Sequence, residues 1–495
     1  MIAAITSKIQ YNTNIITYIA SFLYIILNGI FLANEMYYFM LVPFGLMIVY
    51  MAFFSLDKLL MLIIFVIPLS IPLQEFTRQY GFNMSLPAEP LLFGVLIVFI
   101  FKLLTERKFD KKIAYHPISI AIYINLLWMI FTSISSSNPA VSIKFVTSRM
   151  WFLVAFYFLG TQLFRNYRNI KRSIWLYVLP LMIVIAYTII RHLTYGIFDR
   201  QVAHWVMSPF YNDHTAYAAI LAMYFPVLLG LAIKSNYSVN LKFIIWLLII
   251  YFGSAIILSY TRAAWLSLVG TFGVWIVIKL RIRFRTILFG IVSLILLFLV
   301  FQTQIFIMLE KNEQDSSADL SEHVKSMSNI SSDASNLERI NRWKSALRMF
   351  RERPILGFGP GTYQFEYAPY QFSNELTIIS TNAGDGGNAH SEYIGPLAET
   401  GVLGSLSFIA IVILTIYTGM KVYKRAKEKE VKMLALSCLL GLISYFLHGF
   451  LNNFLDTDKA SAPFWGFIAI IVAIDVYHSQ KVSEPSEVSV KKLNN

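Results

Sequence analysis

One histidine of this sequence lies where a polar segment gives way to an apolar one, in His390-Ser-Glu-Tyr-Ile-Gly-Pro-Leu-Ala-Glu-Thr-Gly401-Val-Leu-Gly404. An imidazole with an ordinary pKa of about 6.5 can accept a proton from a hydroxyl at neutral pH. We therefore interpret His390 as a candidate general base. Glu392 and Glu399 are the nearest carboxylates, and either could orient the imidazole or face water. Gly401 and Gly404, three residues apart, would share a helix face and permit close helix packing.

Several basic residues flank apolar runs, where a charge must snorkel, pair or bind something. Arg262 stands in a very short connection, 259–265, between two such runs, and Arg200 lies in the polar segment ahead of them. Arg262 either snorkels or binds an anionic head group, because guanidinium forks match diphosphate oxygens. Lys144 and Arg149 lie at the end of another apolar run. Snorkelling explains Lys144, whereas Arg149 lies deeper.

The segment that follows Arg200 contains two histidines and an aspartate, which suggests a metal site. The spacing of His204, Asp213 and His214 matches no recognised set of metal ligands. Asp213 or Thr215 as the N-cap of the next helix is the simpler interpretation. The only cysteine, Cys438, excludes an intramolecular disulfide and a cysteine cluster. We therefore expect no metal and no cofactor.

The elements that position these residues must be membrane helices. Of the 495 residues, 57% are hydrophobic and 14% are charged, and the mean hydropathy is +0.60. Soluble domains carry about 25% charged residues, so a soluble enzyme is excluded. Apolar runs of about 20 residues, each long enough to cross a bilayer, recur along the chain. The net charge of +13 fits basic cytoplasmic loops better than nucleic-acid binding.

We expect an all-α polytopic bundle of about 12–14 spans. The candidate spans start near residues 14, 36, 58, 87, 115, 145, 173, 214, 241, 262, 286, 402, 431 and 461. Basic residues cluster on every second connection, within 107–112, 165–172, 279–285 and 421–432. The positive-inside rule therefore predicts that both termini are cytoplasmic.

The expected organisation places one large loop between two groups of spans. Residues 1–308 would hold about 11 spans, 309–390 the large periplasmic loop, 391–478 about 3 spans, and 479–495 a cytoplasmic polar tail. The first part of the loop, 312–336, is polar and serine-rich, and we expect it to be mobile.

A capping box at 335–338 then predicts a helix that Pro354 ends. Its apolar stripe would pack on the bundle or lie in the membrane interface. That stripe consists of Leu337, Ile340, Trp343, Leu347 and Phe350.

The same helix is strongly basic, although the positive-inside rule disfavours positive charge on that side of the membrane. Its basic residues are Arg339, Arg342, Lys344, Arg348, Arg351 and Arg353. They form either a solvated face or a set of phosphate contacts. The glycine-rich segment 354–363 follows, and it either wraps a phosphate or forms a plain turn.

Four elements in this order resemble those of the O-antigen ligase and polymerase superfamily. His390-Ser391, nine residues and then Gly401-x-x-Gly404 look like its signature. The segment Tyr-Thr-Arg262-Ala-Ala-Trp is similar to its Ser-Arg-Gly-Ala-Trp element. Arg339-x-x-x-Trp343 ahead of Pro354-x-x-Gly357-x-Gly359 resembles the helix and turn of its large loop, and 208–217 resembles its Gly-x-Phe-x-Asn-Pro-Asn segment. The similarity covers roughly residues 200–425.

The resemblance implies an undecaprenyl-diphosphate-linked glycan donor at the periplasmic face of the bacterial inner membrane. Ligases of the family move the glycan to a lipid A–core sugar, polymerases to another lipid-linked repeat, and relatives to a protein. Carried over by position, Arg262 and Arg339 would hold the diphosphate and His390 would assist the acceptor hydroxyl. Where the family often has an arginine before its Gly-x-Phe element, this chain has His204-Trp-Val-Met-Ser, and Arg200 is the nearest candidate.

These observations favour a metal-independent, inverting glycan ligase, because the sugar–diphosphate bond is already activated and needs charge stabilisation of its leaving group. A polymerase of the same superfamily is the first alternative. A lipid-linked oligosaccharide flippase is the alternative from another class. A flippase should carry charges along many helices, whereas here they concentrate in the outer loop and at the outer helix ends.

Overall fold

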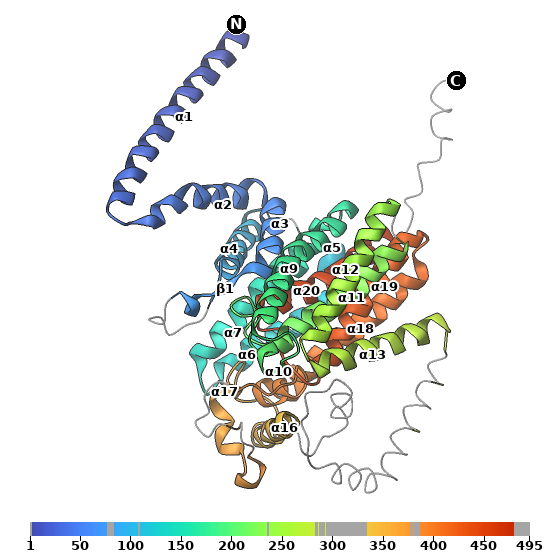
Figure 1. The fold of residues 1–495 in the computed structure, drawn as a ribbon. Coiled ribbons are helices and arrows are strands. Elements are labelled where there is room, and N and C mark those ends of the chain that lie inside the picture. Colours follow the sequence, from blue (N-terminus) through green and yellow to red (C-terminus); the bar gives the residue numbers. More distant parts are fainter. Residues whose placement is uncertain are drawn as a thin grey trace, which may run out of the picture. The chain divides into compact units, whose positions relative to one another are not determined.

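The computed structural model describes residues 2–76, 84–106, 109–234, 237–282, 334–376 and 387–479, together with the single residues 286, 293 and 380. This part of the chain is 79% helical (Figure 1), which confirms the all-α fold class. Contacts divide the chain into two units, residues 1–60 and 61–495.

The first unit consists of apolar helices. Tyr24 and Phe31 of its first helix stack on Phe39 of the connection, with ring centroids 5.6 and 4.4 Å apart. Its elements are α1 (Ile2–Ala33), the 3-10 helix η1 (Tyr37–Leu41) and α2 (Val42–Phe54), and the start of α3 (Leu56–Val66) closes it.

The second unit is a helical bundle with one small antiparallel ladder, β1 (Ile71–Pro72) with β2 (Ser85–Leu86). Its N-terminal half contains α4 (Ala88–Glu106), α5 (Lys111–Ala114), α6 (Pro117–Ile134), α7 (Pro139–Phe152), α8 (Gly160–Leu163), α9 (Tyr167–Tyr195), α10 (Arg200–Ala203), α11 (His214–Lys234), α12 (Val239–Leu258) and α13 (Arg262–Lys279). Its C-terminal half contains α16 (Ala334–Glu352), α17 (Tyr363–Glu366), α18 (Gly395–Arg425), α19 (Lys429–His448) and α20 (Asp458–Ala473). Short 3-10 or π segments cover Ile67–Leu69, Leu73–Glu75, Leu153–Leu159, Ala368–Tyr370, Ser373–Glu375 and Ile474–His478.

Within the described ranges, twelve segments are long and apolar enough to cross a membrane, as expected. They are 15–33, 37–54, 88–106, 117–134, 139–163, 167–195, 214–233, 239–258, 262–279, 395–425, 429–448 and 458–478. The span expected near residue 58 is not among them, because α3 has only 11 residues and ends before Pro68. The span expected near residue 286 lies outside the described residues, as do loop residues 309–333 and tail residues 480–495.

The core of the second unit lies between α11, α19 and α20, whose side chains are mostly buried. Glycines permit this close packing. A Cβ added at Gly230 of α11 would lie 1.8 Å from Oγ of Ser437 in α19. A Cβ at Gly441 of α19 would lie 2.4 Å from the Met223 carbonyl oxygen of α11. Substitution of either glycine would therefore push these two helices apart.

The helix ends of the second unit form two groups, which we call the basic end and the site end. The basic end contains Asp475, which lies 3.0 Å from Nζ of Lys421 and 3.5 Å from Nε2 of His116. At the site end, the Ser137 backbone N–H donates to the Phe358 carbonyl (2.8 Å), and the Glu392 N–H donates to the Gly449 carbonyl (2.8 Å). The site end therefore joins the connections around residues 137, 358, 392 and 449.

Candidate active site

His390 is held at the site end by its own loop. Its backbone N–H donates to Oδ1 of Asn388 (3.1 Å), and its φ of 48° lies in the left-handed region. The next residue, Ser391, is buried and accepts N–H groups from Tyr393 and Ile394. The imidazole itself is half-buried and makes no hydrogen bond within the part of the chain that the structure describes. This imidazole is therefore available to take a proton.

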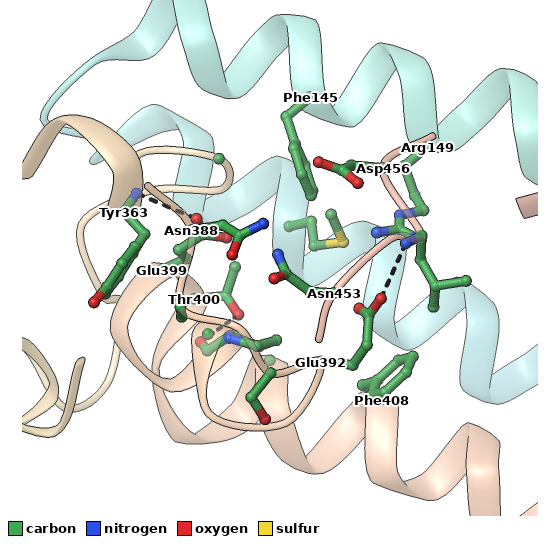
Figure 2. A pocket seen from close by; sticks show the side chains of 18 of the residues that line it. Phe145, Arg149, Tyr363, Asn388, Glu392, Glu399, Thr400, Phe408, Asn453 and Asp456 are labelled. Atoms are coloured by element: carbon green, nitrogen blue, oxygen red, sulfur yellow. Dashed lines mark hydrogen bonds between the residues drawn. The ribbon is translucent and has the colours of Figure 1, made fainter. Parts of the chain in front are cut away.

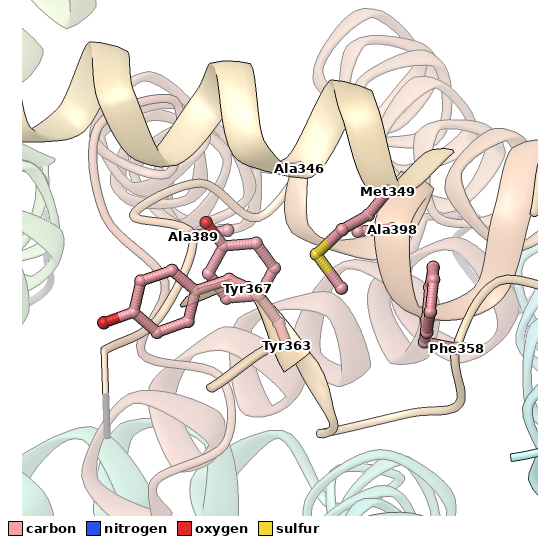
Figure 3. Close-up of a cluster of buried hydrophobic side chains, with 7 residues drawn as sticks. All are labelled: Ala346, Met349, Phe358, Tyr363, Tyr367, Ala389 and Ala398. Carbon is pink, nitrogen blue, oxygen red and sulfur yellow. The ribbon is translucent and has the colours of Figure 1, made fainter. Parts of the chain in front are cut away.

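A buried apolar cluster packs the large loop against the bundle beside His390 (Figure 3). It joins α16 to the chain just before His390 and to the first turn of α18. Its members are Ala346, Met349, Phe358, Tyr363, Tyr367, Ala389 and Ala398. Since the cluster includes the neighbour of His390 in sequence, it couples the position of α16 to that of the imidazole.

The helix predicted in the loop is confirmed as α16, but its buried face differs from the predicted apolar stripe. Within α16 the fully buried residues are Glu338, Asn341, Arg342, Ser345, Ala346 and Met349. Of the predicted stripe, Leu347 is 41% exposed and the other members are half-buried. The buried side of the helix therefore combines polar and apolar residues, and Leu347 is the one member of the predicted stripe that is exposed, beside the charged residues Lys344, Arg351 and Glu352.

Two arginines of α16 lie beside His390. Nε of Arg339 donates to the Leu451 carbonyl (3.1 Å) in the connection between α19 and α20. Nε of Arg342 donates to Glu338 (2.7 Å), and its guanidinium lies 4.3 Å from the centroid of the Tyr367 ring. Nη1 of Arg342 is buried and has no hydrogen-bond partner among the described residues. A buried guanidinium N–H without an acceptor is suited to an anionic ligand.

Burial and the nearby charged groups together set the pKa of His390. Burial, together with the positive charges of Arg339 and Arg342, lowers the pKa of His390 from its ordinary value to about 4. The carboxylates of Asp213 and Glu338 act in the opposite direction. The imidazole is therefore neutral at pH 7, which is the state a general base requires.

Asp213 caps α11, which confirms the simpler interpretation of that aspartate. Its Oδ1 accepts the Thr215 N–H (2.9 Å) and lies 3.0 Å from Nδ1 of His214. Burial opposes ionisation of Asp213, but the hydrogen bonds from His214 and Thr215 outweigh it and hold the pKa of the carboxyl below its ordinary value. The carboxylate is therefore charged at neutral pH.

The two histidines of this segment stack on each other. The rings of His204 and His214 lie 4.2 Å apart and are tilted by only 12°. Burial, with the charges of His214 and Arg200, lowers the pKa of His204 to about 4. No group of three or more His, Cys, Asp or Glu that could hold a metal occurs among the described residues, and the expected absence of a metal stays a prediction.

Arg262 and Arg200 lie at the same end of the unit. Arg262 begins α13, which packs on α19 through the Ser267 and Ser444 hydroxyls, 3.1 Å apart. Arg200 begins α10, whose N-cap is Asp199. Tyr260, just before Arg262, donates to the Phe198 carbonyl (3.2 Å), so the segments that carry the two arginines are in contact.

Glu392 and Glu399, the carboxylates nearest to His390 in sequence, form hydrogen bonds with other residues. Glu392 accepts hydrogen bonds from the Tyr445 hydroxyl and from the backbone N–H groups of Phe454 and Leu455, at 2.7, 2.8 and 3.0 Å. Glu399 accepts the Tyr363 N–H (3.2 Å). The interpretation of either residue as an imidazole partner is therefore wrong, and both hold loops against the start of α18.

The glycine-rich segment is a plain turn rather than a phosphate loop. Its N–H groups are used within the protein: Phe358 donates to the Ala398 carbonyl (2.9 Å) and Gly359 to the Glu399 carbonyl (2.8 Å). Gly401 also departs from the prediction, because its φ of 67° and ψ of −169° interrupt α18. A Cβ at Gly401 would lie 2.0 Å from the Ile355 carbonyl oxygen. Gly401 therefore makes room for the turn and does not share a regular helix face with Gly404.

Two cavities lie beside this loop, and the smaller has a volume of about 250 Å³. Figure 2 shows Arg149 in its wall beside Asp456 and Glu392. The positive charge of Arg149 favours the ionised form of both carboxylates, although burial raises the pKa of each. Arg149, which the sequence placed deeper than Lys144, therefore lies on a cavity wall beside carboxylates.

The larger cavity, of about 830 Å³, shares Asn388, Asn453 and Asp456 with the smaller one. None of these three residues was singled out from the sequence. A run of polar residues between the last two apolar runs, 452–459, was the available signal for Asn453 and Asp456. Arg342 was noted only as one basic residue among six on its helix.

The fold, with its twelve helical segments that are long and apolar enough to cross a membrane among the described residues, is that of a multi-pass membrane protein. Residues 243–409 match the family model described as O-antigen ligase. This region, about a third of the chain, contains Arg262, Arg339 and His390, and it belongs to the O-antigen ligase superfamily, which confirms the resemblance. In general terms it is a membrane glycosyltransferase of ligase or polymerase type that uses lipid-linked glycans. No curated protein matches the chain.

Proposed function

We propose that this protein is an O-antigen ligase-like glycosyltransferase that moves a glycan from undecaprenyl diphosphate to lipid A–core or a related acceptor. The observation that carries the proposal is the position of His390 beside two arginines of α16, one of which has a buried Nη1 without a hydrogen-bond partner among the described residues. A base next to an anion-binding group is the combination that transfer from a diphosphate requires.

In this proposal the arginines stabilise the leaving group. The bond from the donor sugar's anomeric carbon to the diphosphate oxygen breaks, and its electron pair stays on the diphosphate. Arg339 and Arg342 donate to the oxygens that gain charge, and Arg262 and Arg200 complete the diphosphate site. Charge-assisted hydrogen bonds in a site shielded from water supply much of the stabilisation that such a reaction needs.

His390 acts on the other reactant. The acceptor hydroxyl oxygen forms the new bond to the anomeric carbon, and its proton passes to the neutral imidazole and then to solvent. Attack opposite the diphosphate inverts the anomeric centre, and no metal takes part. Recovery of the donor's own anomeric configuration in the product would contradict inversion.

The distribution of charge supports an orientation in the inner membrane. Lys171 pairs with Glu430, and Lys421 pairs with Asp475, at the basic end. By the positive-inside rule this end faces the cytoplasm, with both termini, and the site end faces the periplasm. The large loop and His390 are then exposed to lipid-linked glycans on the outer side.

Purified protein, undecaprenyl-diphosphate-linked glycan and lipid A–core in EDTA test this function. We expect a lipid A–core band shifted by the glycan, and a loss of about 10²- to 10⁴-fold in transfer rate for His390→Ala, the range for removal of a general base. The matched control is His478→Ala, because His478 lies at the basic end, where its Nε2 is 2.8 Å from the Phe164 carbonyl oxygen. Normal transfer by His390→Ala would exclude His390 as the base.

The same reaction separates the alternatives. Elongated chains on the donor lipid, without a lipid A–core conjugate, would identify a polymerase. Movement of intact donor across vesicle membranes without any new glycosidic bond would identify a flippase and contradict the proposal. A control ligase active on the same substrates must be run in parallel.

A further inference from the structure

The larger cavity at the site end has the size and wall chemistry of a ligand site. Its volume of about 830 Å³ lies within the range typical of small-molecule pockets. Its walls come from the start of α4, from α7, from the segment before α11 and from the segment before and at the start of α20. Neither Arg339 nor Arg342 is among the described residues that line it.

Among the described residues of the cavity wall, acidic side chains outnumber basic ones. They are Glu89, Asp213, Asp456 and Asp458, with Lys144 and Lys459. Nζ of Lys459 lies 3.7 Å from Oδ1 of Asp458. The formal charge of this wall is therefore negative, in contrast to the two arginines of α16 nearby.

Four polar atoms on this wall lack a hydrogen-bond partner in the described structure. They are Oδ2 of Asp458, Nε1 of Trp151, Oδ1 of Asn453 and the hydroxyl oxygen of Tyr211. The Asp458 side chain is 1% exposed and Trp151 is 9% exposed, so neither is freely solvated. A buried polar atom without a partner costs about 1–3 kcal/mol. Two acceptors, one donor and one hydroxyl match sugar hydroxyls, each of which both donates and accepts.

His390 is not among the described residues that line the cavity, but two residues of the wall are linked to it. Asn388 lines it and accepts the His390 backbone N–H. Asp213 lines it too, and its charge acts on the His390 imidazole. A sugar bound in the cavity would therefore present a hydroxyl close to the candidate base. The aromatic faces of Trp151 and Phe145, also on the wall, can stack on the apolar face of a sugar ring.

We propose that this cavity binds the terminal sugar of the acceptor and that it accepts an uncharged saccharide. This inference rests on the proposed function and adds the acceptor class to it. A phosphorylated sugar or a uronic acid would bring a further anion beside the Asp213 carboxylate, which is charged at neutral pH, and the cavity would therefore disfavour it. In this proposal the diphosphate of the donor binds the arginines of α16, and the acceptor sugar binds the cavity. The donor and the acceptor therefore contact different groups of charged residues near His390.

Two cavity variants test the inference with little risk to folding. Trp151→Phe removes the indole N–H but keeps an aromatic ring against Phe93 and Phe152, and Asp456→Asn keeps the size and shape of a side chain on the cavity wall. We expect each to raise the acceptor KM about five- to tenfold, the effect of one lost hydrogen bond. The donor KM, and the release of undecaprenyl diphosphate by water without acceptor, should stay within about twofold.

The matched controls lie away from the cavity. Trp246→Phe changes a tryptophan of α12 that is 45% exposed, and Glu428→Gln changes an exposed carboxylate at the basic end. Both should leave the acceptor KM unchanged. Unchanged acceptor KM in both cavity variants, with normal transfer by the wild-type protein, would overturn the cavity assignment while leaving the proposed function intact.

A binding measurement does not depend on transfer. Saturation-transfer NMR on the detergent-purified protein uses methyl glycosides of glucose, galactose and N-acetylglucosamine, with galacturonic acid as the charged probe. We expect signals for at least one neutral glycoside, weakened in Trp151→Phe, and none for galacturonic acid. If these signals appear but no glycan is transferred, the proposed function is contradicted and the cavity assignment is not. An equal or stronger signal for galacturonic acid, or no signal from any neutral glycoside, would contradict the uncharged acceptor.

Discussion

The two ends of the second unit use charge differently. At the basic end, Lys421, Arg425 and His116 all lie within 4 Å of the Asp475 carboxylate, at 3.0, 3.8 and 3.5 Å. At the site end, Nη1 of Arg342 and Oδ2 of Asp458 are buried without a hydrogen-bond partner in the described residues. At the basic end three cationic side chains surround one carboxylate, although its Oδ1 accepts no hydrogen bond among the described residues. At the site end the unpartnered N–H of Arg342 can donate to a ligand.

This difference separates charged side chains that stabilise the fold from charged side chains that bind a ligand. A carboxylate that joins α20 to α18 and to the start of α6 contributes to the stability of the bundle. A guanidinium N–H that the fold leaves without an acceptor costs free energy in the empty protein. Such a cost is recovered when an anion binds, so the site end should govern catalysis and the basic end should govern stability.

The largest expected effect comes from the unpartnered arginine. Arg342→Gln together with Glu338→Gln removes the guanidinium without leaving a buried, unpaired carboxylate. We expect the transfer rate to fall about 10²- to 10³-fold, as for the loss of a donor to a developing oxyanion. Steady-state kinetics measure this, and Arg351→Gln, an exposed residue of the same helix, is the control. Equal rates in both variants would remove Arg342 from the diphosphate site.

A smaller effect, on stability, is expected at the basic end. Asp475→Asn weakens the contacts to Lys421, Arg425 and His116, and two of these partners are partly exposed to solvent. We expect a loss of about 1–3 kcal/mol, read as a lower melting temperature in detergent. The transfer rate well below that temperature should change less than twofold. A large loss of activity in a protein that remains folded would break the proposed division between the two ends.

The smallest effect is a shift in the pH profile. Protonated His390 cannot accept a proton, so kcat/KM should fall as the pH drops through the pKa of about 4 in the free enzyme. Bound diphosphate offsets the positive charges of Arg339 and Arg342, which are a secondary cause of the lowered pKa. The acid limb of kcat should therefore lie at a higher pH than that of kcat/KM. Coincident limbs would mean that the diphosphate does not approach His390.

The free energy of unfolding should also decrease as the pH is lowered. Burial and the neighbouring arginines favour neutral His390 in the folded protein, whereas an unfolded histidine has a pKa of about 6.5. The unfolded chain therefore binds more protons between about pH 4 and 6.5, and the contribution of this group to stability falls as the pH is lowered through that window.

Part of the site could be predicted because it depends on local patterns. His390 stands at a boundary between polar and apolar residues, and Arg262 stands in a very short connection. Residue type and position in the sequence were therefore enough to select both as candidate site residues. The helix of the large loop was predicted from its capping box, its periodicity and Pro354. Within the described residues the spans followed from hydropathy, except where α3 stops after 11 residues.

The remainder depends on contacts between distant segments. Hydropathy identifies the apolar stripe of α16, but it does not show that the buried side contains Glu338 and Arg342, which pair with each other within the loop. Glu392 is adjacent in sequence to the His390 loop, yet its partners Phe454 and Leu455 lie about 60 residues away. The periodicity of residue types in the sequence does not indicate hydrogen bonds between segments so far apart.

The outward apolar stripe of α16 has a consequence for the lipid environment. Leu347 is 41% exposed, while Arg342, on the other side of the same helix, is 5% exposed. If α16 lies in the membrane interface, as one of the two interpretations of its apolar stripe has it, its depth follows the thickness of the bilayer. The height at which Arg339 and Arg342 meet a lipid head group would then change with acyl-chain length. Lipid composition would thereby adjust the rate of this enzyme without any change in its catalytic residues.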